Sequence, residues 1–206
     1  MIYAVIDTNI LVSAALAYNN RKSIPYLIFK GVFDKSFIPL VDDNIVKEYR
    51  NVLYRPKFSF ETFLVDKIIN TILKYAVNQT VPSTGTELPD EDDIIFYDVA
   101  VAHQDKGAYL VTGNQKHFPN CPFVISARDF LTVITPSSLP NVVSENKVPY
   151  DAYGLLDALH KAQRLAYENG VANLSEEEIE AEIKTARRER HQRSFVLFST
   201  FSPVQV

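Results

Sequence analysis

The spacing of apolar residues alternates between two periods along the first two thirds of the chain. Short apolar runs at residues 3–6, 37–41, 77–81, 108–112 and 123–125 have the length and composition of strands. The segments between them repeat apolar residues roughly every three to four positions, which predicts helices at 10–18, 23–30, 42–54, 60–75, 90–105 and 127–134. Strands that alternate with helices in this way are typical of a parallel sheet covered on both faces. The pattern therefore predicts a three-layer α/β/α fold with a central parallel sheet of four to five strands.

The alternating pattern stops at a stretch rich in proline and serine. This stretch divides the chain into a domain of residues 1–135, a linker of residues 136–150 and a helical C-terminal extension of residues 151–206. We therefore expect one α/β domain with a separate helical extension.

The extension contains two helix signals. The first covers residues 151–168, and the second begins with the capping box Ser175-x-x-Glu178. The second helix is acidic at its front and basic at its back, which matches the helix dipole. Residues 194–206 have no helical period, so we expect this end to be poorly ordered.

Composition restricts the cellular setting more than the activity. The single cysteine, Cys121, excludes an internal disulfide and is typical of a reducing cytosol. The apolar run at residues 10–17 lacks the basic segment of a signal peptide, and no run approaches the roughly 18 apolar residues of a membrane span. We therefore expect a cytoplasmic protein. The net charge of −4 does not indicate a nucleic-acid partner, although a divalent cation on an acidic cluster would reverse the charge locally.

Polar side chains occur where two of the predicted strands end. Asp7 directly follows the run of residues 3–6, and Asn114 lies just after the run of residues 108–112. Open α/β folds bind ligands at the carboxyl ends of their strands. Asp7 could equally be a turn residue or a helix N-cap, so its position alone does not decide between the two interpretations.

Three further acids lie in the predicted helices. Glu48 is beside the apolar stripe of its helix, although a solvated ion pair with Lys47 or Arg50 would explain it as well. Asp93 is in the first turn of a helix, where a carboxylate also compensates the dipole. Asp98 lies in an apolar run and needs a partner or a metal. Converging carboxylates repel one another, and a hard divalent cation such as Mg²⁺ or Mn²⁺ removes that repulsion.

Four segments occur in an order that identifies a family. They are residues 5–13 (VIDTNILVS), residues 43–49 (DNIVKEY), residues 92–98 (DDIIFYD) and residues 108–119 (AYLVTGNQKHFP). With these segments the chain resembles the PIN-domain nucleases, and specifically the VapC-like toxins of bacterial type II toxin–antitoxin systems. The resemblance covers residues 1 to about 135. It implies a Mg²⁺-dependent endoribonuclease, in which Mn²⁺ substitutes for Mg²⁺, that hydrolyses RNA phosphodiester bonds.

The resemblance also implies roles for the acids. Asp7, Glu48 and Asp93 would form the catalytic site, with Asp7 and Asp93 as the principal metal ligands. Many family members carry a fourth acid where this chain has Asn114. We hypothesise that Asp98 supplies the missing charge as a catalytic and metal-binding residue, the alternative being that it pairs with a surface lysine.

Six neighbouring residues would contact the substrate or support the acids: Thr8, Asn9, Thr112, Asn114, Lys116 and His117. Thr8 or Thr112 would fix Asp7 or a water at the metal. Lys116 and His117 could contact the substrate phosphate, although a turn stabilised by its own side chains explains them nearly as well.

Residues 168–190 resemble the tail of the antitoxins that accompany such toxins, in which a helix and a following arginine cover the nuclease site. Because arginine pairs bidentately with carboxylates, Arg187 or Arg188 could enter the acidic site and inhibit the enzyme, within one chain or across a homodimer. The expected partners are therefore RNA and either a cognate antitoxin or the chain's own tail. An amphipathic helix that only completes the core or a dimer contact is the alternative.

Other functions remain open. A phosphatase of the haloacid dehalogenase type needs a second aspartate where this chain has Asn9. A flap-nuclease-like enzyme needs accessory elements that do not fit in this length. A catalytically weak PIN-like module that binds protein or RNA is a further alternative, with Asn114 marking decay of the site.

Overall fold

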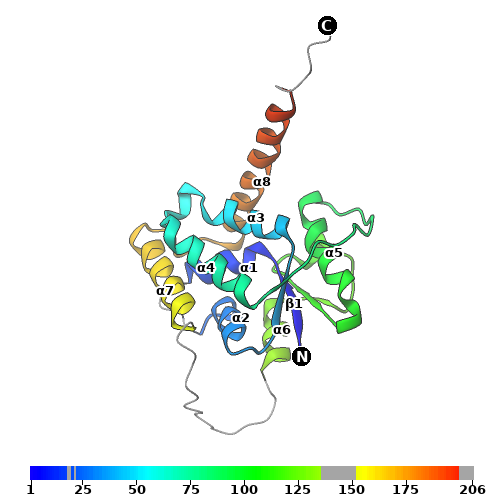
Figure 1. Cartoon of the computed structure of the whole chain (residues 1–206). Coiled ribbons are helices and arrows are strands. Elements are labelled where there is room, and N and C mark those ends of the chain that lie inside the picture. The colour runs from blue at the N-terminus through cyan, green and yellow to red at the C-terminus, as the bar shows by residue number, and fades with distance from the viewer. Residues whose placement is uncertain (18–19, 21, 136–151, 200–206) are drawn as a thin grey trace.

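The strands of the chain form one parallel sheet in the computed structural model, which describes residues 1–17, 20, 22–135 and 152–199 (Figure 1). The five strands are β1 (Tyr3–Ile6), β2 (Ile38–Val41), β3 (Val77–Asn78), β4 (Tyr109–Val111) and β5 (Val124–Ile125). Their order is β3-β2-β1-β4-β5, and every neighbouring pair is parallel. The chain thus extends the sheet from β1 first toward β3 and then toward β5. This reversal places the ligand-binding crevice of such folds between β1 and β4.

Six helices of the first 135 residues cover this sheet. They are α1 (Thr8–Leu16), α2 (Ile24–Phe33), α3 (Asp43–Leu53), α4 (Thr62–Tyr75), α5 (Ile94–Ala102) and α6 (Ala127–Ile134). Short 3₁₀ helices lie between them: η1 (Pro56–Phe58), η2 (Glu91–Asp93), η3 (Gln104–Lys106) and η4 (Gln115–His117). α5 packs across β1, β2 and β4, whereas α2 packs against both α1 and α6. The three-layer α/β/α fold expected from the sequence is confirmed.

A local sequence signal sets the start of α3. The Asp42 carboxylate caps α3 by accepting a hydrogen bond from the Asn44 N–H at 2.7 Å. The predicted helix of residues 23–30 stops before Gly31, but α2 continues through this glycine to Phe33. Gly31 is instead a packing position, because a Cβ atom there would lie 3.1 Å from Cδ1 of Ile134 on α6.

The C-terminal extension packs into the same core as the sheet domain. It consists of α7 (Ala152–Glu168) and α8 (Glu176–Ser199). α7 lies beside α4 and α1, and α8 crosses α1 and α3 (Figure 1). Apolar residues on both helices, such as Leu159 and Ile183, are buried in the shared core. The Gln163 side chain also donates a buried hydrogen bond of 2.8 Å to the Ala14 carbonyl on α1.

The ends of the extension differ in part from the expectation. The capping box forms, since the Ser175 hydroxyl accepts from the Glu178 N–H and the Glu178 carboxylate accepts from the Ser175 N–H. α8 continues to Ser199, so residues 194–199 are helical and not without regular structure. The predicted linker at 136–150 and the last residues, 200–206, lie outside the described residues.

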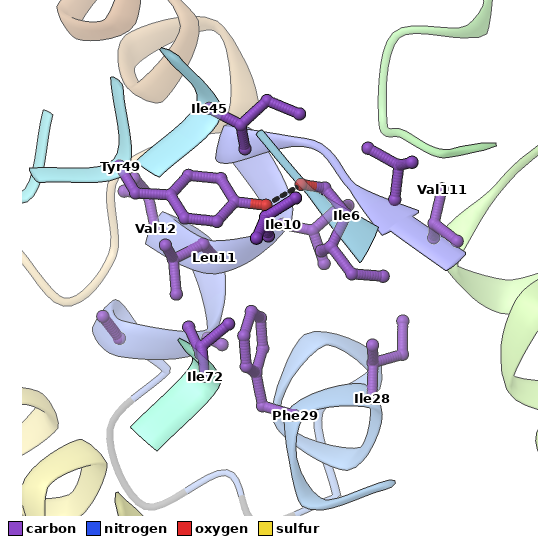
Figure 2. Packing of buried hydrophobic residues seen from close by; sticks show 14 of the residues in the cluster. Ile6, Ile10, Leu11, Val12, Ile28, Phe29, Ile45, Tyr49, Ile72 and Val111 are labelled. Carbon is purple, nitrogen blue, oxygen red and sulfur yellow. Dashed lines mark hydrogen bonds between the residues drawn. The ribbon is translucent and has the colours of Figure 1, made fainter. Parts of the chain in front are cut away.

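One buried hydrogen bond links the core to the end of β1. The Tyr49 hydroxyl on α3 donates to the Ile6 carbonyl, as Figure 2 shows among the surrounding apolar side chains. Ile10, Ile45 and Val111 pack around this pair, and each apolar side chain of this size contributes about 1.5–3 kcal/mol by burial. Glu48 directly precedes Tyr49, and Asp7 directly follows Ile6. The contact therefore also holds the part of α3 that carries Glu48 near Asp7.

Every helix in the part of the chain that the structure describes is too short or too polar to cross a membrane.

Candidate active site

The Asp7 carboxylate is fixed at the carboxyl end of β1. The Asp7 N–H donates to the Val111 carbonyl at 2.9 Å, which continues the pairing of β1 with β4. Its Oδ2 accepts hydrogen bonds from the Thr112 hydroxyl at 2.6 Å and from the Asn9 amide at 2.9 Å. Asp7 stands at the N-cap position of α1, but its side chain makes no capping hydrogen bond. The N-cap interpretation therefore does not explain this carboxylate.

Glu48 on α3 turns into the molecule. Only 1% of the residue is exposed, and its Oε1 accepts a hydrogen bond from the Thr8 hydroxyl at 2.7 Å. Arg50, one of its alternative partners in the sequence, pairs with Asp66 instead. The interpretation of Glu48 as a solvated surface charge is therefore wrong.

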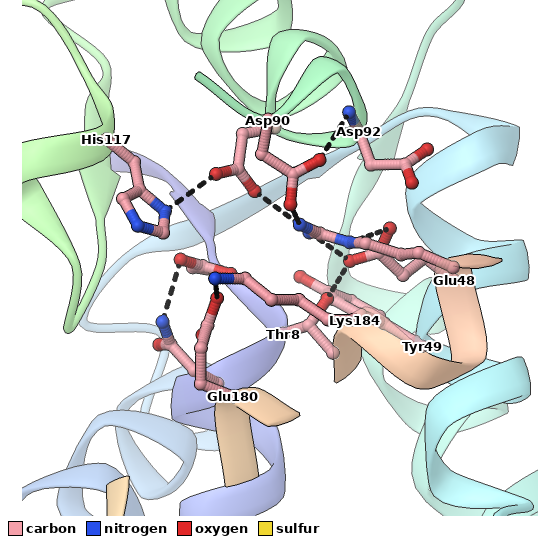
Figure 3. Close-up of polar contacts among 12 residues, drawn as sticks. Thr8, Glu48, Tyr49, Asp90, Asp92, His117, Glu180 and Lys184 are labelled. Atoms are coloured by element: carbon pink, nitrogen blue, oxygen red, sulfur yellow. Dashed lines mark hydrogen bonds and ion pairs between the residues drawn. The ribbon is translucent and has the colours of Figure 1, made fainter. Parts of the chain in front are cut away.

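Two further carboxylates come from the segment that leads into α5. Asp93, at the end of η2, is buried, and its Oδ2 lies 3.1 Å from Nδ1 of His117. Asp90 precedes η2, and its Oδ1 accepts from the Asp92 N–H at 3.1 Å. Thr8, Glu48 and Asp90 point toward a common space in Figure 3. The three acids predicted from sequence thus belong to one site, and Asp90 joins them.

A guanidinium from α8 lies among these carboxylates. Nη2 and Nε of Arg187 donate to the two oxygens of Glu48 at 2.7 and 3.2 Å. Nη1 donates to Asp90 and to Asp93, each at 2.8 Å. Arg187 is only 4% exposed. The contact is a buried, bidentate and charge-assisted network, which is the strong form of this interaction.

Carboxyl groups outnumber the cations of the cluster, because Asp7, Glu48, Asp90 and Asp93 face the guanidinium of Arg187 and, at 3.6 Å from Glu48, that of Arg190. Burial, and next the charge of Asp93, raise the pKa of Asp7 from 3.8 to about 7, against the opposing effects of Thr112 and Arg187. Burial also raises the pKa of Glu48, which Arg187 counteracts. Burial alone would lower the pKa of Arg187, but the carboxylates raise it above its ordinary value. Buried carboxyl groups with this balance favour an additional cation.

The donor set of the cluster fits a hard divalent cation. All of its acidic ligands offer oxygen, which is what Mg²⁺ and Mn²⁺ prefer. Among the described residues, however, no three acidic, histidine or cysteine side chains are arranged as a ready metal site. The oxygens of Glu48 and Asp93 are taken up by Arg187. The chemistry of the site therefore fits a metal, while its present geometry is that of an arginine site.

Asp98 has partners of its own. Its Oδ1 accepts hydrogen bonds from the N–H and the hydroxyl of Thr84, at 3.0 and 2.6 Å. Five positions along a helix rotate a side chain by about 140°, which turns Asp98 away from the direction of Asp93. The structure gives no support to the prediction that Asp98 is a catalytic, metal-binding residue that replaces the acid missing at Asn114. The alternative, a surface lysine as its partner, does not describe this contact either.

The smaller polar residues divide between the acids. Thr112 supports Asp7, whereas Thr8 supports Glu48. The Asn114 N–H donates to the Thr112 hydroxyl at 2.9 Å, so this residue braces the support of Asp7. Lys116 is exposed.

Sequence reasoning missed a second set of contacts beside the cluster. Asp92 is paired with Arg190 and with His191, whose Nε2 lies 3.1 Å from its Oδ2. Arg190 also lies 3.6 Å from Glu48. A usable signal was present, because residues 90–93 are all acidic and the back of α8 is basic. Arg188, which was named together with Arg187, is exposed.

Comparison with known proteins assigns the sheet domain. A family model described as the PIN domain matches residues 3–116, a range that contains Asp7, Glu48 and Asp93. Neither the curated proteins nor the solved structures contain a match to the chain. PIN domains are generally metal-dependent nucleases, which hydrolyse phosphodiester bonds. The family model spans more than half of the chain and includes its acidic cluster, and the protein is therefore a member of the PIN domain family.

Proposed function

We propose that this protein is a Mg²⁺-dependent endoribonuclease. The observation that carries the proposal is the group of buried carboxylates at the carboxyl end of β1, where the pKa of Asp7 is raised to about 7. All four acids of the group lie in the range that matches a family of metal-dependent nucleases. RNA as the substrate and Mg²⁺ as the cation come from the resemblance to VapC-like toxins.

Asp7 and Asp93 would hold the metal, with Glu48 as a further ligand or as the base beside it. When bound, the cation would activate water and stabilise the charge that develops on the phosphate. Thr112 and Asn9 hold Oδ2 of Asp7, which orients the rest of the carboxylate. Glu48 is oriented by Thr8, and its carboxylate could accept the proton of the attacking water. His117 contacts Asp93 and could also donate to a substrate phosphate.

A toxin role in a toxin–antitoxin pair is part of the proposal. The contacts of Arg187 with Glu48 and Asp93 support this role. Such contacts are expected from the resemblance of the C-terminal residues to antitoxin tails. The partners would then be RNA and either a cognate antitoxin or the chain's own C-terminal helices.

A second candidate is a catalytically weak PIN-like module that binds protein or RNA. Two observations favour it: a guanidinium lies on the acids, and Asn114 stands where many relatives carry an acid. In that case Arg187 would replace the metal permanently.

Cleavage of a single-stranded RNA separates these candidates. The full chain and its Arg187→Ala variant are incubated with a labelled RNA in Mg²⁺, in Mn²⁺ and in chelator. We expect cleavage that needs metal, is lost when Asp7→Asn is added, and is kept when the exposed Asp105 becomes Asn as a control. Absence of metal-dependent cleavage in both proteins would overturn the nuclease proposal.

A further inference from the structure

We propose that the groove between α5 and the loop before η2 binds a linear aliphatic polyamine. The groove has a volume of about 710 Å³, which lies within the range of small-molecule sites. Residues of the loop between positions 83 and 88 line one side, and residues of η2 and α5 line the other. The inference does not depend on the proposed function, because it assigns a second ligand site to a different face of α5.

The groove carries negative charge that no neighbouring cation balances. Glu87, Glu91 and Asp98 line it, whereas no lysine, arginine or histidine of the described residues does. None of these three acids forms an ion pair within the part of the chain that the structure describes. Charges of one sign in a groove with apolar walls attract ions of the opposite sign. The ligand expected here is therefore a cation.

Asp98 distinguishes this groove from a group of surface acids. The residue is 3% exposed, and both hydrogen bonds from Thr84 go to its Oδ1. Every fully buried side-chain oxygen of the described residues has a hydrogen-bond partner, and Oδ2 of Asp98 has none among them. Oδ2 must therefore face open space, and the groove is open space that Asp98 lines. A carboxylate held in this way is a strong acceptor for a charged donor.

The helix dipole does not explain all of these acids. Glu91 lies just before α5, where a carboxylate compensates the dipole. Asp98 lies beyond the first turn of α5, and the dipole effect has decayed there. Asp98 is thus the residue that points most directly to a ligand.

The spacing of the acids indicates the length of this ligand. Glu91 and Asp98 are seven positions apart, so about 10 Å separates them along the helix, and both lie on one face. Ile94 and Ile95 lie between them, line the same groove and are partly buried. The groove thus presents an acid, an apolar segment and a second acid in succession. Spermidine matches this order, because its terminal ammonium groups are about 11 Å apart on an extended aliphatic chain.

A basic peptide fits the groove less well. Its side chains could meet the acids, but its backbone N–H and C=O groups would lie over the isoleucines, where unpaired polar groups cost free energy. A polyamine has methylene groups between its nitrogens and avoids this cost. The hydroxyls of Ser83 and Thr86 also line the groove and can accept hydrogen bonds from ammonium groups.

The test measures spermidine binding to the full chain by calorimetry at about 0.15 M salt, which screens non-specific attraction to exposed acids. We expect Asp98→Asn to weaken binding by about tenfold, because it removes the charge of a buried acceptor. Asp105→Asn is the matched control, since it removes a charge from an exposed position outside the groove and should leave the affinity unchanged. Equal spermidine affinity of these two folded variants would overturn the inference.

A second variant guards against loss of folding in Asp98→Asn. Glu91 is exposed, so Glu91→Gln should fold normally and weaken binding by about twofold to fivefold. The shorter 1,4-diaminobutane should bind less tightly than spermidine, because it cannot reach both acids at once. Equal affinity for the two amines would overturn the match in length. Tighter binding of a lysine-rich peptide than of spermidine would assign the groove to a protein partner and overturn the polyamine.

Nuclear magnetic resonance of the labelled protein locates the ligand. We expect spermidine to shift the amide signals of Thr84 and Ile94. Shifts confined to Asp7 and Glu48 would place spermidine on the other acidic cluster and overturn the inference. Mn²⁺ affinity and RNA cleavage should be the same in Asp98→Asn and in the unmodified protein. Failure of RNA cleavage would therefore refute the nuclease and leave this inference intact, whereas failure of spermidine binding would do the reverse.

Discussion

The buried Asp7 carboxylate should make the metal-free protein less stable as the pH rises. Its pKa is about 7 in the folded chain against an ordinary value of 3.8, so the unfolded chain loses this proton first. An acid with a raised pKa in the folded state contributes stability at low pH that is lost between the two pKa values. Replacement by Asn removes the ionisation and keeps an oxygen that can accept from Thr112 and Asn9.

The magnitude follows from the two pKa values. The complete rise from 3.8 to about 7 corresponds to about 4 kcal/mol. Between about pH 5 and about pH 8 the folded chain realises about 2 to 3 kcal/mol of this penalty. As the pH rises over this interval, the free energy of unfolding of Asp7→Asn should therefore increase by that amount relative to that of the unmodified protein. For a chain of this length the gain corresponds to roughly 5 to 10 °C in melting temperature.

The assay is chemical and thermal unfolding of both proteins in chelator at the two pH values. The difference in the free energy of unfolding between the two proteins is determined at each pH, and the two differences are compared. This comparison cancels the titration of every group that behaves alike in both proteins. The exposed Asp105→Asn serves as the control and should show no such change. A stability difference between Asp7→Asn and the unmodified chain that is the same at both pH values would refute the account of Asp7 as a buried, destabilised carboxylate.

Three further predictions concern separate parts of the molecule. Thr112→Val removes the 2.6 Å hydrogen bond to Asp7, which lowers the pKa of this carboxyl group in the unmodified protein. Because Asp7 is then less ionised near neutral pH, we expect Mn²⁺ affinity in calorimetry to fall by about tenfold; unchanged affinity would show that Thr112 does not support the site. Asp98→Asn should leave Mn²⁺ affinity unchanged, because its carboxylate serves Thr84, and a marked loss would reinstate Asp98 as a ligand. Ile183→Ala should lower the free energy of unfolding in urea by about 2–5 kcal/mol, since this side chain is buried where α8 joins the core; a loss well below that range would indicate that α8 is not part of the cooperative fold.

The fold and the first acid could be derived from the sequence because they depend on local signals. β1 is a short apolar run that ends in Asp7, and the periodicity of the following segments determines the alternation of strands and helices. The parallel sheet then brings the ends of β1 and β4 together, which explains why Thr112 reaches Asp7 from a position far along the chain.

Other features depend on contacts that no local pattern contains. Asp98 needed a partner, but that partner is Thr84 in the loop between β3 and η2, and its choice depends on how this loop folds over α5. Gly31 is compatible with a helix end or with close packing, and only the proximity of Ile134 decides for packing. The involvement of Asp90 follows from the entry of α8, which brings Arg187 between α3 and η2.

The central claim is that Asp7, Glu48 and Asp93 form a divalent-cation site that Arg187 occupies in this structure. Crystals of the Arg187→Ala variant grown or soaked with Mn²⁺ test it directly by anomalous diffraction at the manganese edge. We predict an anomalous peak within about 2.0–2.3 Å of carboxylate oxygens from Asp7 and Asp93, close to the space that the guanidinium fills in the unmodified protein. Well-ordered carboxylates without any peak at saturating Mn²⁺ would contradict it.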